Sequence, residues 1–99
     1  MQTIESVSWY QLTSIAATLA GVSHSRVFSR DRSKRVCHVR FAVWHVLYSS
    51  GQYSLQDIAD AAGYLDHGTI SNGLIRARKL LKTSPNFIRL VSELSKRLS

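Results

Sequence analysis

The chain has 99 residues, of which 44% are hydrophobic, and 13 Lys and Arg against 6 Asp and Glu give it a formal net charge of +7. This length and hydrophobic content favour one small domain with its own core and exclude a disordered tail. No apolar run approaches the about 18 residues of a membrane span, and a lone cysteine, Cys37, excludes an internal disulfide. We therefore expect a single cytoplasmic domain, without signal peptide or membrane association, whose charge favours a polyanionic partner.

The first half of the chain predicts two helices separated by a basic loop. Apolar residues recur at mostly helical spacing over about residues 7–20, and Gly21 follows where a helix would stop. The residues expected to face inward are Val7, Tyr10, Ile15, Ala16 and Leu19. Residues 21–35 have no long period and predict a loop. A short turn within it is expected to bury Val22, Val27 and Phe28. Residues 36–50 are apolar on two faces, which is typical of a central, buried helix.

Residues 54–82 predict a helix-turn-helix. The stretch "SLQDIADAAG" begins with Ser54 as N-cap and carries Asp57 three residues later, a weak form of the capping box. Gly63 ends this first helix and suits a turn that needs positive φ. Ala59, four residues earlier, is small enough for the two helices to cross closely.

The second helix of this motif is expected to begin at Asp66, whose carboxylate suits an N-cap and the positive helix start. Its inward residues would be Ile70, Gly73 or Leu74, Ala77 and Leu81. Its exposed first turn carries small or polar residues that can approach base edges in a major groove, namely His67, Gly68, Thr69, Ser71 and Asn72.

A last helix is expected over residues 86–98, after Pro85. The residues expected to face inward from it are Phe87, Ile88, Val91, Leu94 and Leu98. No strand pattern is present anywhere in the chain. The predicted fold class is therefore all-α, a small bundle of about five helices within one domain over residues 1–99.

Basic residues gather in two clusters. Arg26, Arg30, Arg32, Lys34, Arg35 and Arg40 make the first, with only Asp31 against them. The second follows the polar turn and comprises Arg76, Arg78, Lys79 and Lys82. A solvated basic face that keeps the protein soluble would have the same composition. Two clusters on either side of a candidate recognition helix favour a phosphate-binding surface instead.

The segment Asp66-His67-Gly68-Thr69-Ile70 resembles the D-H-T-T-V motif in the C-terminal DNA-binding domain (domain IV) of DnaA, the bacterial replication initiator. The preceding "SLQDIADAAG" is similar to the family's "SLPEIGDAFG", and "VFSRDR" and "VCHVRFAVWHVL" stand where the family has "LLSKRR" and "VARPRQMAMAL". These segments align without a gap from about Val22 to Ile70, and "SPNFIRLVSELSKRL" resembles the final helix more loosely. No GxxxxGK[ST] phosphate loop is present, so we expect a stand-alone domain of this Trp repressor-like fold.

The resemblance implies a recognition helix in the major groove and a loop arginine in the adjacent minor groove. It implies groove-reading roles for Asp66, His67 and Thr69, and a minor-groove role for Arg32. It also implies phosphate or nearby base contacts for Arg40, and it places Arg76 at a basic position of the family. Gly68 departs from the family by replacing a threonine, and Phe41 replaces a glutamine. The family's A-R-P-R segment has become Cys37-His38-Val39-Arg40. The family's target sequence is therefore not carried over to this chain.

The complete predicted interface has two sets of residues. Those expected to contact bases are Asp66, His67, Gly68, Thr69, Ser71, Asn72 and Arg32. Those expected to contact phosphates are Arg30, Lys34, Arg35, Arg40, Arg76 and Lys79. Asp66 could equally act only as an N-cap that orients His67. With about six phosphate contacts, the slope of log affinity against log salt is expected to be roughly −5.

The leading hypothesis is a sequence-specific double-stranded DNA-binding protein that regulates transcription or replication at the nucleoid. No catalysis, cofactor or metal is expected, because Cys37, His38 and His45 lack the spacing of a zinc site and no nucleophile elbow is present. The alternative is a protein-interaction module, or a competitor that mimics the initiator's DNA-binding domain. A protein partner would use the N-terminal helix or the apolar surface near Trp9, Tyr10 and Phe41. The oligomeric state is left open.

Overall fold

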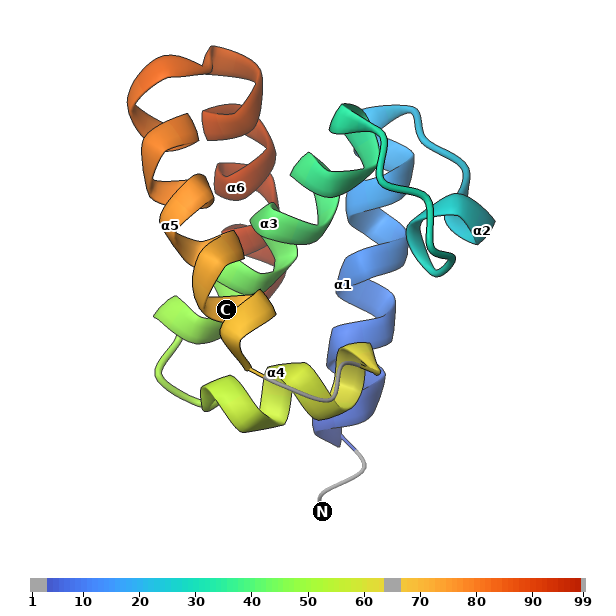
Figure 1. The fold of residues 1–99 in the computed structure, drawn as a ribbon, viewed down its shortest axis with the longest axis vertical. Helices are drawn as coiled ribbons and strands as arrows, with labels where there is room; N and C mark the ends of the chain where they lie inside the picture. Colours follow the sequence, from blue (N-terminus) through green and yellow to red (C-terminus); the bar gives the residue numbers. More distant parts are fainter. Residues whose placement is uncertain (1–3, 64–66, 99) are drawn as a thin grey trace.

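The computed structural model describes residues 4–63 and 67–98, the first five of them by their backbone alone. These residues form six helices and no strand, so the predicted all-α class is confirmed (Figure 1). The helices are α1 (Ile4–Ala20), α2 (His24–Val27), α3 (Lys34–Ser49), α4 (Leu55–Ala62), α5 (Gly68–Thr83) and α6 (Pro85–Leu98). The one more than expected is the four-residue α2, which lies inside the segment predicted as loop.

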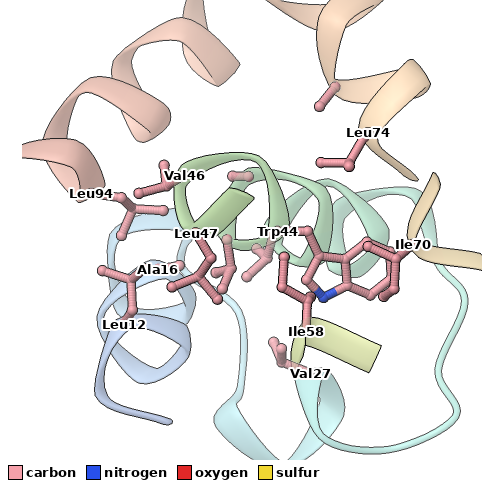
Figure 2. Packing of buried hydrophobic residues seen from close by; sticks show 14 of the residues in the cluster. Leu12, Ala16, Val27, Trp44, Val46, Leu47, Ile58, Ile70, Leu74 and Leu94 are labelled. Carbon is pink, nitrogen blue, oxygen red and sulfur yellow. The ribbon is translucent and has the colours of Figure 1, made fainter. Parts of the chain in front are cut away.

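Helix α3 is the centre of the molecule, as its two apolar faces predict. It contacts each of the other five helices, and Figure 1 shows it passing between α1 on one side and the α5–α6 pair on the other. The stripe of Val36, Val39, Val43 and Leu47 is buried. Figure 2 shows side chains of the surrounding helices gathered around α3, among them Leu12, Ile58, Ile70 and Leu94. One continuous core therefore holds the two basic clusters in fixed relation.

Helix α1 follows its predicted pattern only in part, because Ala16 is buried and Ile15 packs against the core as expected, whereas two larger residues are exposed. Tyr10 and Leu19, expected to face inward, are 57% and 46% exposed. Among the α1 side chains that the structure describes, those of Leu12, Thr13, Ala16 and Ala17 are buried. The buried Thr13 hydroxyl donates a hydrogen bond to the Trp9 backbone carbonyl at 2.8 Å, so this polar group has a partner. Val7 lies among the residues whose side chains are not described.

The segment between α1 and α3 folds onto α3 through α2. Val22 and Val27 are buried, as expected, whereas Phe28 is 40% exposed and stacks on Tyr10 with 5.1 Å between ring centroids. Both rings were expected inside because they are large and apolar, but each covers the other at the surface. Helix α3 begins at Lys34, two residues before the predicted start.

Helix α4 has the capping box that its sequence predicts. The Asp57 backbone N–H donates to the Ser54 hydroxyl at 3.1 Å, and the Ser54 backbone N–H donates to the Asp57 carboxylate at 2.9 Å. Gly63 ends the helix with φ of +82°, a conformation that glycine adopts without steric cost. Ala59 is fully buried. The predicted N-cap of the next helix, Asp66, lies outside the described residues, and His67 holds the N-cap position of α5.

Helix α5 packs closely against α3 at Gly73. A Cβ atom added there would lie 2.5 Å from two ring carbons of Trp44 and 3.1 Å from Phe41. Only glycine therefore permits this approach of α5 to the central helix. Helix α6 completes the bundle by burying Phe87 and Leu94, whereas the predicted inward residue Ile88, which lies about 100° round the helix from Phe87, is 45% exposed.

Candidate nucleic-acid interface

Six of the predicted DNA-contacting residues line one cleft between the start of α3 and the first turns of α5. The cleft has a volume of about 540 Å³. From the loop and α3 it is lined by Arg32, Lys34 and Arg40, and from α5 by Thr69, Asn72 and Arg76. The cleft therefore joins residues of the first basic cluster to the polar turn and to Arg76, although its α3 and α5 sides are at least 25 residues apart in sequence. We refer to this surface as the α3–α5 cleft.

The α5 side of the cleft is a single helical stripe. Thr69, Asn72 and Arg76 are spaced by three and four residues, which places them on one face of α5, and all three are exposed. His67 and Gly68 are exposed at the start of the same helix, whereas Ser71 is half-buried and faces away from the cleft. Lys79 is exposed further along α5. The stripe is polar at its N-terminal end and cationic one turn later.

The α3 side places cations at a positively polarised helix start. Lys34 and Arg35 are the first two residues of α3, and the first turn holds no acid. Cations at a helix N-terminus oppose the helix dipole by about 0.3–1 kcal/mol each. Both side chains are exposed, so their own burial does not offset this cost. A local arrangement that costs stability without a packing gain is typical of a functional surface, here one that attracts anions.

The loop before α3 is held by an ion pair that the sequence pattern did not predict. Arg26 Nε donates to the Asp31 carboxylate at 2.7 Å, and Arg26 Nη2 donates to the Ser33 hydroxyl at 3.1 Å. The Ser33 backbone N–H donates back to Asp31 at 2.7 Å. The Arg26 hydrogen bond, followed by those from Ser33, lowers the pKa of Asp31 to about 2. Asp31, which stands alone among six cations in the sequence, therefore fixes the loop's shape.

Arg40, in α3, holds the same loop through its guanidinium. Its guanidinium donates to four backbone carbonyls: those of Asp31 at 2.7 Å, Ser29 at 2.8 Å, Val27 at 3.1 Å and Arg26 at 3.3 Å. The residue is only 9% exposed. Its donors therefore hold the loop in place, and the DNA contact that the resemblance implies for Arg40 stays a prediction. Arg30 and Arg32 remain exposed on the loop that it holds.

Two histidines of α3 have pKa values lowered by burial and by neighbouring cations. Burial, followed by the charges of Lys34 and Arg76, lowers the pKa of His38. Burial and then the charge of Arg78 lower the pKa of His45. Burial first, and the neighbouring positive charges second, therefore favour the neutral form of both imidazoles. Within residues 4–63 and 67–98 no group of three or more His, Cys, Asp or Glu could hold a metal ion.

The apolar surface expected near Trp9, Tyr10 and Phe41 is divided between two places. Tyr10 and Phe28 form an exposed stack, and the Trp9 ring packs edge-on against Phe28 with 5.6 Å between ring centroids. The Trp9 Nε1 atom is buried without a hydrogen-bond partner. Phe41 instead lines the α3–α5 cleft. In the described part of the chain, no helix combines the length and the hydropathy needed to cross a membrane.

Most of this chain is similar in sequence to part of a known replication initiator. The chromosomal replication initiator protein DnaA of Lachnoclostridium phytofermentans is 27% identical over 77 residues, which cover 78% of this chain but 17% of that protein, in its C-terminal region. This chain therefore spans less than a fifth of the relative's length. No protein-family model matches the chain, and no solved structure does. The sequence is thus similar to part of DnaA, in agreement with the resemblance of residues 66–70 to the D-H-T-T-V motif of that family.

Proposed function

We propose that this protein binds double-stranded DNA in a sequence-specific manner through the α3–α5 cleft, and regulates transcription or replication at the nucleoid. One observation carries the proposal: the cleft joins exposed cations of the loop and α3 to a polar stripe at the start of α5. The similarity to DnaA, a protein named for replication initiation, agrees with it. In this proposal the chain is a binding protein and not an enzyme.

The start of α5 would serve as the recognition helix of a helix-turn-helix formed with α4. Thr69 and Asn72 have short polar side chains that can donate to and accept from base edges, and His67 and Gly68 precede them at the helix tip. Gly68 presents no side chain at the position where a threonine stands in the DnaA motif. A duplex would therefore meet a different surface there, and we expect the preferred sequence to differ at the corresponding base.

Exposed cations around the cleft would contact the phosphates. Arg30, Lys34, Arg35, Arg76 and Lys79 are all exposed, and Arg32 lies at the cleft where a minor groove would pass. Arg40 would act by holding the loop that presents Arg30 and Arg32. With five phosphate contacts in place of six, the slope of log affinity against log salt becomes roughly −4.5.

The test is a selection of binding sites from random duplex DNA, followed by fluorescence anisotropy with the selected duplex over a salt series. Asn72→Ala should cost about 1–3 kcal/mol and relax the preference at one base position, whereas Arg76→Ala should weaken all sequences alike and reduce the salt slope by about 1. Arg97→Ala, at the far end of α6, is the matched control and should change neither. If no sequence is enriched and Arg32→Ala leaves affinity unchanged, the proposal fails.

A second candidate function, a protein-interaction module, is favoured by the exposed Tyr10–Phe28 stack. This stack lies outside the α3–α5 cleft, so DNA bound there would leave it uncovered. Tyr10→Ser and Phe28→Ser should leave DNA affinity unchanged in either case. Only the interaction-module hypothesis predicts that these two changes abolish a protein complex that survives nuclease treatment.

A further inference from the structure

A second cleft lies on the other side of the α3 start, between α3, the end of α1 and the first half of α6. Its volume is about 630 Å³, within the range of specific ligand pockets, which is about 300–1,000 Å³. Val39, Phe87 and Leu90 give it apolar walls, and Leu19 adds an exposed apolar side chain at the rim. We refer to it as the α1–α6 cleft. The DNA-binding proposal makes no use of these apolar residues.

Cations surround these apolar walls. Lys34, Arg35 and Arg89 line the cleft and are exposed, and among the described residues no ion pair is formed by any of the three. The acid that lines the same cleft, Glu93, is engaged by Lys96 at 3.5 Å. A ligand that fits must therefore offer carboxylates or other anions together with apolar side chains.

We propose that the α1–α6 cleft binds an acidic peptide segment of a partner protein, whose apolar side chains enter between α1 and α6 while its carboxylates meet Lys34, Arg35 and Arg89. Duplex DNA fits less well, because a phosphate backbone has no apolar groups to cover Leu19 and Leu90. A second copy of this chain is disfavoured by charge, since each copy carries +7. An acidic amphipathic segment supplies both requirements.

The two clefts share a wall, which makes the peptide and DNA competitors. Lys34 and His38 line both clefts. The Lys34 ammonium cannot lie against a carboxylate in one cleft and a phosphate in the other at the same time. A bound acidic segment would also place negative charge beside the path of the DNA backbone. Peptide binding should therefore lower DNA affinity, which gives the protein a means of regulation by its partner.

The test begins with selection from a phage library of random peptides about 16 residues long, a length that allows four helical turns in the cleft. Enriched peptides should combine acidic and apolar residues. A labelled selected peptide should bind the intact chain about tenfold more weakly when Arg89 is changed to Glu, or when the exposed Leu19 is changed to Ser. Arg97→Glu, which makes the same charge change on α6 outside the cleft, should leave binding unchanged.

Three results would overturn the proposal. The first is that no acidic peptide is enriched, and the second is that Arg97→Glu weakens binding as much as Arg89→Glu, which would mean attraction by net charge alone. The third is that Arg89→Glu weakens duplex binding but not peptide binding, which would assign the cleft to DNA. Because the peptide assay contains no DNA, its outcome does not depend on whether the DNA-binding proposal holds.

Discussion

Replacing Arg40 by glutamine should release the loop that presents Arg30 and Arg32. In the native protein one guanidinium holds four carbonyls at 2.7–3.3 Å. Hydrogen bonds from a charged donor contribute about 1.5–3 kcal/mol each, but carbonyls at the loop surface regain water when the donor is removed. If only about two of the four hydrogen bonds count in full, at about 1.5 kcal/mol each, the free energy of unfolding falls by roughly 3 kcal/mol. A domain stable by about 5–15 kcal/mol would remain folded.

The assay pairs urea denaturation with DNA anisotropy on the same variants. Arg40→Gln should lower stability by the stated amount and duplex affinity by about tenfold, because the loop must then be ordered on binding. Arg40→Lys is the decisive comparison, since it keeps the charge while its compact ammonium cannot reach four carbonyls that lie along a loop. We expect it to be nearly as unstable as Arg40→Gln.

The opposite pattern would refute a positioning role. If Arg40→Lys has native stability and affinity, while Arg40→Gln loses only affinity and about one unit of salt slope, then Arg40 contacts phosphate directly. A double-mutant cycle separates the two cases further. With a positioning role, Arg32→Ala should cost affinity in the native protein and much less in the Arg40→Gln background.

Three further changes test the packing and the local hydrogen bonds by denaturation. Gly73→Ala should destabilise by about 1–3 kcal/mol or shift α5, because its Cβ would lie 2.5 Å from the buried Trp44 ring; native stability would mean that the two helices separate easily. Ser54→Ala should cost about 1 kcal/mol by removing the capping box of α4, and Ser54→Thr, which keeps a hydroxyl, should cost less. Asp31→Asn should be less stable than the native protein near pH 6. Because pairing with Arg26 lowers the folded pKa of Asp31 to about 2, this difference should shrink as pH falls from about 4 and disappear below about 2, and an undiminished difference at pH 2 would contradict the ion pair's role.

The sequence by itself determined the helical class and most of the local signals. The stripe of Val36, Val39, Val43 and Leu47 indicated a central helix, and the structure buries it at the middle of the bundle. The capping box at Ser54 appears as predicted. Such signals are readable because their causes lie within a few residues along the chain. The DNA-contacting residues were selected by motif and charge, and six of them meet in one cleft, although their individual roles stay predictions.

Tertiary structure alone decided which long side chains face the loop, the solvent or a neighbouring helix. Arg40 bonds to carbonyls 9–14 residues away, and their position depends on how α2 packs against α3. Tyr10 and Phe28 are large apolar residues of the kind found in cores, but they are exposed and stack on each other at the surface. The α1–α6 cleft likewise arises where three helices distant in sequence diverge. Periodicity assigns faces to one helix at a time, whereas these contacts depend on the relative placement of several helices.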